Sequence, residues 1–120
     1  MPYEPSEILD QNVIAELLEV GDAEFLQDLF ETYMEDAHDK LQNIEKALTD
    51  GDAQALGRLA HTFKGSSGNI GAPALSEIAE KLQHLGAEDQ LDSVEPLVAE
   101  LKELYQLVEQ AMKVELQKLT

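Results

Sequence analysis

Apolar residues recur every three or four positions along almost the whole chain, and this spacing restricts its fold more than any other feature. The spacing is clear in SEILDQNVIAELLEV at 6–20 and in AEFLQDLFETYMEDAHDKLQNIEKALTD at 23–50. Side chains three and four positions apart share one face of an α-helix, whereas a half-buried strand alternates with a period of two. No segment shows strand-like alternation or a repeat of fixed period. The pattern therefore predicts an all-α fold.

Turn and capping residues divide this pattern into five predicted helices. Gly21 is expected to end the first helix, while DGD at 50–52 and NIGAP at 69–73 separate the later ones. The predicted helices cover about 6–19, 22–49, 52–70, 73–85 and 93–118, with Ser6 as the N-cap of the first. Short connections between long amphipathic helices favour antiparallel neighbours. We predict an antiparallel up-down four-helix bundle, with a short additional N-terminal helix over one end, in a single domain spanning 1–120.

Composition and charge exclude several classes of protein. The 120 residues are 43% hydrophobic, which suffices for one core, and they include no cysteine for disulfides, thiolate metal sites or a cysteine nucleophile. The net charge of −17 argues against nucleic acid and anionic membranes as partners, because both bind basic faces. The sequence shows no signal peptide and no apolar run of about 20 residues. We therefore expect a cytoplasmic protein.

The segment LAHTFKGSSGNIGA at 59–72 differs from the rest of the chain because it combines a histidine and a lysine with three glycines. Projected at about 100° per residue, the third predicted helix has a core face and an opposite face. The predicted core face consists of Leu56, Leu59, Ala60, Phe63, Ser67 and Ile70. His61 falls nearly opposite and points away from the core that its own helix builds. This placement argues against a buried structural histidine.

Three glycines share the face of His61, namely Gly57, Gly65 and Gly68. A glycine inside a helix costs about 1 kcal/mol relative to alanine. Bare backbone, however, lets another molecule approach the helix closely, which is a reason to tolerate that cost. Gly65, one turn after His61, supports this interpretation best, whereas Gly57 can be coincidental and Gly68 can simply loosen the helix end.

Two of only eight basic residues, Arg58 and Lys64, lie three positions either side of His61 and on the same face. In a chain with 25 acids they would form a local positive spot, which stabilises a dianionic group attached to the imidazole. Neutral imidazole is a nucleophile at cellular pH, so the pattern suits capture of a phosphoryl group. The alternative is that Lys64 pairs with an acid such as Glu80 or Glu77. The sequence lacks the pattern of a Ser-His-Asp triad.

The stretch AHTFKGSSGNIGAPAL at 60–75 resembles the signature of the histidine-containing phosphotransfer (HPt) domain, His-x-x-Lys-Gly with small residues and then a Gly-Ala-Leu segment. The surrounding helical pattern is similar too, so the resemblance covers about residues 6–110. It implies a four-helix bundle with His61 as the exposed phosphoacceptor. It also implies that Lys64 neutralises the phosphoryl group, that Gly65 lets a receiver domain approach and that Gln83 bonds and orients the imidazole. One departure is Phe63, where many members have leucine.

The resemblance further implies a relay between receiver domains. A phosphorylated aspartate in the receiver domain of a hybrid sensor kinase would pass its phosphoryl group to His61, which would donate it to the aspartate of a response regulator. Mg²⁺ would belong to the receiver, so no cofactor and no metal site of the chain's own are expected. The sequence contains no P-loop and no kinase glycine-rich loop, so we expect a phosphoryl carrier that does not phosphorylate itself from ATP. A relay that visits two partners is expected to be a monomer.

The docking surface for a receiver is expected to surround His61. On the third predicted helix it would include Arg58, Gly65 and Gly68. The resemblance adds apolar residues from the first two helices, namely Ile8, Val13, Leu17, Phe30 and Met34. The alternative for each of these five residues is a place in the core.

Two other classes of function compete with the relay. Glu35 and His38 match the Glu-x-x-His spacing of carboxylate-bridged di-iron bundles, but such sites need a second motif, which the sequence lacks. His38 and His84 are therefore interpreted as surface residues. A non-catalytic helical docking module, which binds receiver or kinase domains without phosphorylation, would keep the glycine face and leave His61 inert. Met1 and the length of one domain favour a free-standing protein over a domain of a longer kinase.

Overall fold

A computed structural model describes residues 3–119. Two short helices, α1 (Pro5–Ile8) and α2 (Gln11–Val20), come first. They are followed by α3 (Ala23–Asp50), α4 (Ala53–Asn69), α5 (Pro73–Ala87), a 3-10 turn η1 (Leu91–Ser93) and α6 (Glu95–Lys118). No strand occurs between residues 3 and 119, so the predicted all-α class is confirmed.

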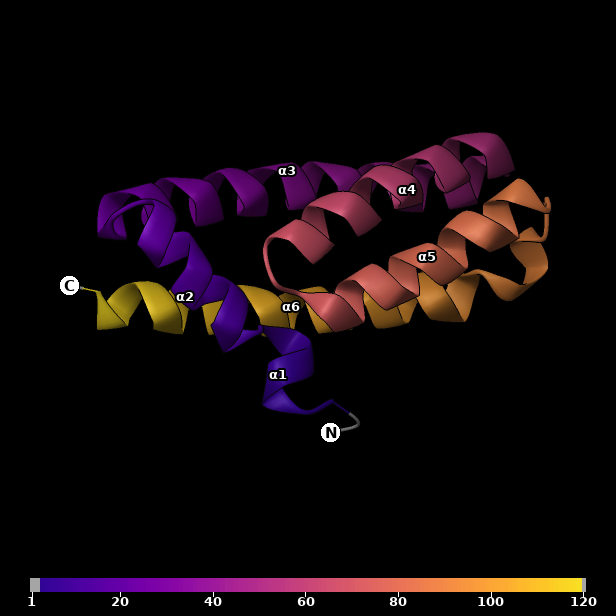
Figure 1. The fold of residues 1–120 in the computed structure, drawn as a ribbon. Coiled ribbons are helices and arrows are strands. Elements are labelled where there is room, and N and C mark those ends of the chain that lie inside the picture. The colour runs from indigo at the N-terminus through magenta and orange to yellow at the C-terminus, as the bar shows by residue number, and fades with distance from the viewer. Residues whose placement is uncertain (1–2, 120) are drawn as a thin grey trace.

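The four long helices pack together in an elongated molecule that measures 44 × 26 × 18 Å (Figure 1). α3 contacts α4 and α6, and α5 contacts the same two helices. α2 lies against α3, and α1 lies against α5 and α6. The most extensive contact joins α4 to α5, and this pair carries the residues of the candidate site.

The N-terminal segment departs from the predicted single helix over 6–19. Leu9 has an extended backbone and a buried side chain, which separates α1 from α2. Asp10 then caps α2, because its carboxylate accepts a hydrogen bond from the backbone of the first turn at 2.9 Å. A capping box built on Glu4 begins α1, so Ser6 is not the N-cap. The prediction was wrong because the apolar spacing continues across a residue that caps a new helix.

The other helix ends follow from local sequence. Gly51, with φ of +71°, ends α3, and Gly71, with φ of +92°, lies in the connection from α4 to α5. Both angles fall in the left-handed region that favours glycine. Pro73 occupies the first turn of α5, where its missing N–H costs no hydrogen bond. The last helix begins at Glu95, two residues later than predicted, because 91–93 form the 3-10 turn.

The core runs between the four long helices and is mostly aliphatic. Its largest fully buried side chains are those of Phe30, Phe63, Leu26, Ile44, Leu56, Leu75, Leu82, Leu101, Leu104, Met112, Val94 and Val108. Ser67 is the buried polar residue of this core within residues 3–119, and its hydroxyl lies 2.7 Å from the hydroxyl of Tyr33. Burial raises the pKa of Tyr33, so the phenol stays protonated. The two hydroxyls share a hydrogen bond that joins α3 to the core face of α4.

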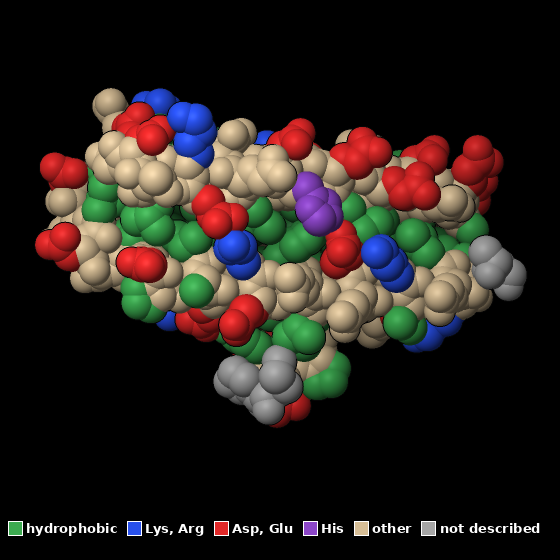
Figure 2. Space-filling model, turned by 180° about the vertical axis from the view of Figure 1, so that it is seen from behind, with side chains coloured by type: hydrophobic (Ala, Val, Ile, Leu, Met, Phe, Trp, Pro, Cys, Tyr) green, Lys and Arg blue, Asp and Glu red, His purple; other side chains and the backbone are tan. Residues whose placement is uncertain are grey.

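Acidic side chains dominate the outside of the molecule. Figure 2 shows Asp and Glu side chains spread along its length, with a strip of hydrophobic side chains running between two rows of polar ones. In the part of the chain that the structure describes, no helix combines the length and the apolar character needed to cross a membrane. Because the net charge is −17, each basic side chain places a local positive charge on a mainly negative surface.

Candidate functional site

Helix α4 presents the predicted core face to the interior and His61 to solvent. The helix begins at Asp52, whose carboxylate accepts a hydrogen bond from the backbone N–H of Ala55 at 3.0 Å. On the predicted core face Leu56, Ala60, Phe63 and Ser67 are fully buried, Ile70 is 4% exposed and Leu59 is half-buried. His61 is exposed on the other side. Helical spacing therefore predicted both faces of α4 correctly.

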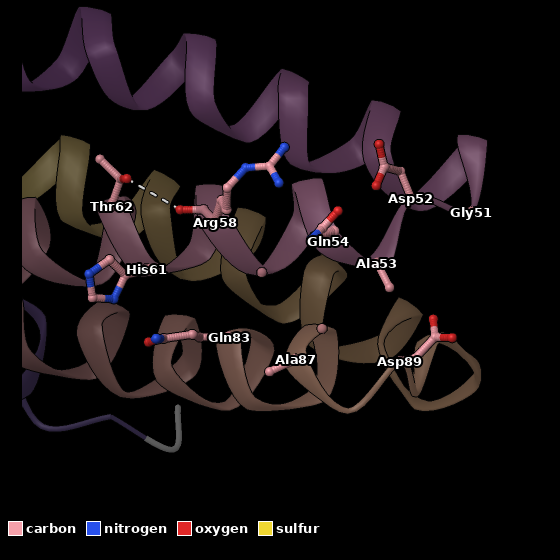
Figure 3. A pocket seen from close by; sticks show the side chains of 12 residues that line it. Gly51, Asp52, Ala53, Gln54, Arg58, His61, Thr62, Gln83, Ala87 and Asp89 are labelled. Atoms are coloured by element: carbon pink, nitrogen blue, oxygen red, sulfur yellow. Dashed lines mark hydrogen bonds between the residues drawn. The ribbon is translucent and has the colours of Figure 1, made fainter.

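His61 borders a surface hollow of about 900 Å³ between α4 and α5 (Figure 3). Figure 3 shows His61 and Gln83 near one end of this hollow, and Asp52 and Asp89 toward the other. The imidazole is therefore open to an approaching molecule, and the acids stand apart from it. This arrangement suits chemistry on an exposed imidazole.

Helices α4 and α5 touch through two glycines, Gly57 and Gly86, which both line this hollow. A Cβ at Gly86 would come 2.8 Å from the Cα of Gly57 and 2.9 Å from the carbonyl oxygen of Ala53. Contact this close excludes a side chain at residue 86. A Cβ at Gly57 would meet backbone atoms of α5 at 3.6 Å, an ordinary contact distance, so the packing requires glycine at 86 and not at 57. Sequence reasoning missed Gly86, because the spacing of residues along one helix does not show which residue of another helix they contact.

Gly65 and Gly68 differ in how open they are. Among residues 3–119, no heavy atom of a neighbouring segment lies within 4 Å of the position that a Cβ at Gly65 would take, and the residue is exposed. A Cβ at Gly68 would lie 3.4 Å from the hydroxyl oxygen of Ser76, which itself donates a hydrogen bond to the carbonyl of Lys64 at 3.0 Å. Bare backbone beside His61 is therefore provided by Gly65, and Gly68 already faces a side chain of α5.

Lys64 is tied to the neighbouring helix. Its ammonium nitrogen lies 3.4 Å from a carboxylate oxygen of Glu80 on α5, and the two side chains are 37% and 48% exposed. The same carboxylate oxygen lies 3.9 Å from Nε2 of His84. The alternative partner suggested by the sequence is therefore present. Lys64 still lies one helical turn after His61, on a flexible stem that can carry its charge to a new group.

Gln83 lines the hollow together with His61 and is half-buried (Figure 3). Within residues 3–119 the structure contains no hydrogen bond between these two side chains. The amide carries both a donor and an acceptor, so it can bond either form of a neighbouring imidazole nitrogen. The tertiary structure thus brings Gln83 beside His61 without joining them.

Arg58 does not reach His61. Figure 3 shows its guanidinium extending from α4 toward α3, away from the imidazole. The side chain also lines a second hollow, between α3 and α4, which includes Asp50 and Lys46. Arg58 thus lines the hollow that His61 borders, but its charged end points away from the imidazole, so the predicted positive spot loses one of its two members.

The predicted apolar docking residues are mostly packed inward. Phe30 is fully buried, so its place in the docking surface was wrong: its side chain fills the core between the long helices. Ile8, Val13, Leu17 and Met34 are half-buried and keep part of their surface exposed.

The Glu-x-x-His pair does not form a metal site with its surroundings. Nε2 of His38 lies 2.8 Å from a carboxylate oxygen of Glu109 on α6, and its ring meets the ring of Tyr105 edge-on at 5.4 Å. Over residues 3–119 no group of three His, Cys, Asp or Glu side chains is placed to hold a metal ion. His38 thus connects α3 to α6.

Comparisons with known proteins agree with this fold and site. The family model of the Hpt domain matches residues 28–111, which is most of the chain, so the chain belongs to the Hpt domain family. The chain is similar to histidine-containing phosphotransfer protein B (HptB) of Pseudomonas aeruginosa PAO1, whose crystal structure matches with a TM-score of 0.89 and 33% identity. That match covers 97% of this chain and 98% of the other.

Two curated relatives are longer proteins. Multistep phosphorelay regulator 1 of Schizosaccharomyces pombe is 31% identical over 97 residues, which cover 78% of this chain and 33% of that protein. The phosphorelay intermediate protein rdeA of Dictyostelium discoideum is 26% identical over 98 residues, which cover 82% of this chain and 38% of that protein. The chain thus spans between a third and two fifths of the length of these relatives.

Proposed function

We propose that this chain relays a phosphoryl group between receiver-domain aspartates in a two-component phosphorelay, through phosphohistidine at His61. The observation that carries the proposal is the exposed His61 on the outer face of α4, with Lys64 one turn later and open backbone at Gly65. Membership of the Hpt family supports it, as does the similarity to phosphorelay proteins of other organisms.

The transfer needs no reactant besides the phosphorylated receiver. One imidazole nitrogen of His61 gives its lone pair to the phosphorus of the aspartyl phosphate. The N–P bond forms while the P–O bond to the aspartate breaks, and the aspartate leaves as a carboxylate with that electron pair. The other ring nitrogen keeps its proton. Transfer onward to the aspartate of a second receiver reverses these bond changes and restores the free imidazole.

Three further residues have proposed roles in this step. Lys64 places a positive charge one turn from the imidazole and stabilises the phosphoryl group in transit. Gln83 holds the ring orientation by bonding the nitrogen that does not react. Gly65 lets the receiver's aspartate approach the helix, because no other segment of the described chain fills the space beside it. Mg²⁺ would be bound by the receiver, where it neutralises the acyl phosphate.

The proposed partners are the receiver domain of a hybrid sensor kinase and that of a response regulator. The carrier would visit both as a monomer in the cytoplasm, without a nucleotide and without catalysing its own phosphorylation. We further propose that residues 1–120 form a single domain, with α3 to α6 as an antiparallel up-down four-helix bundle. The contacts of α3 and α5 with both α4 and α6 support that arrangement.

Transfer of label from phosphorylated receiver domains tests the proposal. A panel of receivers carrying radiolabelled aspartyl phosphate is mixed with the native chain and with the His61→Ala variant. We expect label on the native chain that is lost in acid, survives base and is absent from the variant. The receiver with the fastest transfer then identifies the partner.

The competing outcome points to a docking module. If a receiver binds the native chain and His61→Ala equally well, and no receiver in the panel transfers label, His61 is not a phosphoacceptor. The hollow between α4 and α5 would then serve only for binding. Circular dichroism of the variant shows whether it keeps the native fold, which is expected because His61 is exposed.

A further inference from the structure

Glu80 on α5 pairs with Lys64, the cation one helical turn after the proposed phosphoacceptor. Its carboxylate is 3.4 Å from the ammonium of Lys64, and the Arg58 side chain extends the other way. Lys64 carries a compact charge at the end of a flexible stem, so its position depends on which nearby anion attracts it more strongly. In the unmodified chain that anion is Glu80.

A phosphoryl group on His61 would compete for the same ammonium. It would carry a charge of about −1.5 to −2, against −1 for a carboxylate, so it would attract Lys64 more strongly. The exchange would weaken or break the Lys64–Glu80 ion pair and leave Glu80 with its longer approach to His84. The loss of this pair is part of the free-energy cost of phosphorylating His61.

We propose that Glu80 is a positioning residue that competes with the phosphoryl group for Lys64 and thereby lowers the stability of phosphohistidine at His61. The inference rests on the proposed function of His61 and goes beyond it by giving a role to an acid on the neighbouring helix. The bond changes of the transfer stay as described above, since Glu80 touches neither the phosphorus nor the imidazole. A carrier whose cation has a competing partner passes its phosphoryl group on more readily.

The surroundings of Glu80 argue against a role in stability. The carboxylate is exposed, lies outside the core cluster and makes its other close approach to His84, at 3.9 Å. Exposed ion pairs of this kind contribute little to folding, because water and salt screen them. A substitution of Glu80 would therefore mainly remove its interaction with Lys64.

The test measures phosphohistidine in Glu80→Gln and in a matched control. Glu77→Gln removes the same charge one turn earlier on α5, from an exposed residue that forms no ion pair within residues 3–119. Each variant is equilibrated with a labelled receiver that transfers to the native chain, and the ratio of phosphorylated to free carrier is measured. A second arm uses phosphoramidate as a small-molecule donor and follows the lifetime of the ³¹P resonance that His61→Ala lacks.

We expect Glu80→Gln to raise the equilibrium ratio of phosphorylated to free carrier by about two- to fivefold, the factor that corresponds to an exposed ion pair. The lifetime of the phosphohistidine resonance should lengthen in the same direction. Glu77→Gln should change both by less than about 1.5-fold, because it removes charge without freeing Lys64. In a Lys64→Gln background the effect of Glu80→Gln should vanish, which a double-mutant cycle measures directly.

Three results would overturn the inference. In the first, Glu80→Gln gives the same phosphohistidine ratio and lifetime as the native chain. In the second, Glu77→Gln raises them as much as Glu80→Gln does. In the third, the effect of Glu80→Gln persists in the Lys64→Gln background. The last result would mean that Glu80 acts by direct repulsion of the phosphoryl group. If no receiver transfers label, the proposed function fails, and the phosphoramidate arm decides the role of Glu80 separately.

Discussion

Gly65 and Gly86 both lie on the α4–α5 side of the molecule, yet a side chain at each would meet different surroundings. At Gly65 a Cβ would meet no heavy atom within 4 Å, whereas at Gly86 it would lie 2.8 Å from the backbone of Gly57. The first glycine is free for an incoming partner, and the second is required by the packing of two helices. Substitutions at the two positions should therefore separate function from stability.

Gly65→Gln should keep the fold and slow phosphoryl transfer. Gln is a better helix former than Gly, so the free energy of unfolding should stay equal or rise by up to about 1 kcal/mol. The new side chain would occupy the space through which the receiver approaches, and transfer should slow by at least about tenfold, equal to about 1.4 kcal/mol in the barrier. Denaturant unfolding and rapid-quench transfer measure the two effects.

Gly86→Ala is the matched substitution at the packed glycine. It should lower the free energy of unfolding by about 1–3 kcal/mol, because α4 and α5 must separate to admit the methyl group. A stable Gly86→Ala, or a Gly65→Gln that transfers at the native rate, would contradict the assignment of the two glycines.

At the scale of helices, the connection from α4 to α5 contacts the junction between α1 and α2. The backbone N–H of Asp10 donates a hydrogen bond to the carbonyl of Gly71 at 2.7 Å. A Cβ at Gly71 would lie 3.0 Å from the Cβ of Val13 on α2. The half-buried Val13 thus packs against the end of the helix pair that carries His61.

Gly71→Ala should destabilise the protein by about 1–3 kcal/mol. Its φ of +92° is strained for any residue with a Cβ, and the added methyl group would press against Val13. Gly51→Ala is the control, since Gly51 has φ of +71° but no heavy atom within 4 Å of the Cβ position. Thermal unfolding should show a smaller loss of stability for Gly51→Ala than for Gly71→Ala. Equal losses of stability would mean that the contact with α2 is unimportant.

At the scale of the whole molecule, acidic side chains on neighbouring helices repel one another unless hydrogen bonds or cations compensate their charge. Glu109 on α6 shows one solution, because it receives hydrogen bonds from His38 at 2.8 Å and from Tyr105 at 3.2 Å, and lies 3.7 Å from the ammonium of Lys113. Partial burial alone would raise the pKa of Glu109, but the hydrogen bond from His38, the charge of Lys113 and the hydrogen bond from Tyr105 lower it. This cluster joins α3 to α6.

Glu109→Gln should lower stability at neutral pH by about 1 kcal/mol, and the difference from the native chain should shrink in acid. A carboxyl whose pKa is lowered by folding stabilises the native state above its ordinary pKa of 4.5 and loses that contribution as the pH falls through the lowered value. Denaturant unfolding between about pH 7 and pH 3 measures the difference. Glu103→Gln, an exposed neighbour on α6, controls for net charge, and a constant difference for Glu109→Gln would contradict the prediction.

Much of this molecule could be predicted from its sequence, because helix spacing and turn residues depend on neighbours within a few positions. Spacing of three and four predicts helices and the buried face of α4, and the same projection placed His61 outside. The left-handed turn residues Gly51 and Gly71 mark connections. The HPt signature depends on a short run of residues, so the resemblance and the proposed phosphoacceptor followed from that run. Each of these features is decided within a few turns of one helix.

Only the tertiary structure decided which residues from different helices meet. The pairing of Gly57 with Gly86, the contact of Lys64 with Glu80 and the burial of Phe30 depend on how neighbouring helices are rotated and spaced. The direction of the Arg58 side chain depends on the groove beside α3. A periodic pattern gives the face of a helix but not the residue that it touches, because a rotation or a shift of one turn changes every partner while leaving the pattern intact. The sequence by itself thus determined the long helices and the exposed position of His61 on α4, and packing determined which residues of neighbouring helices surround that candidate site.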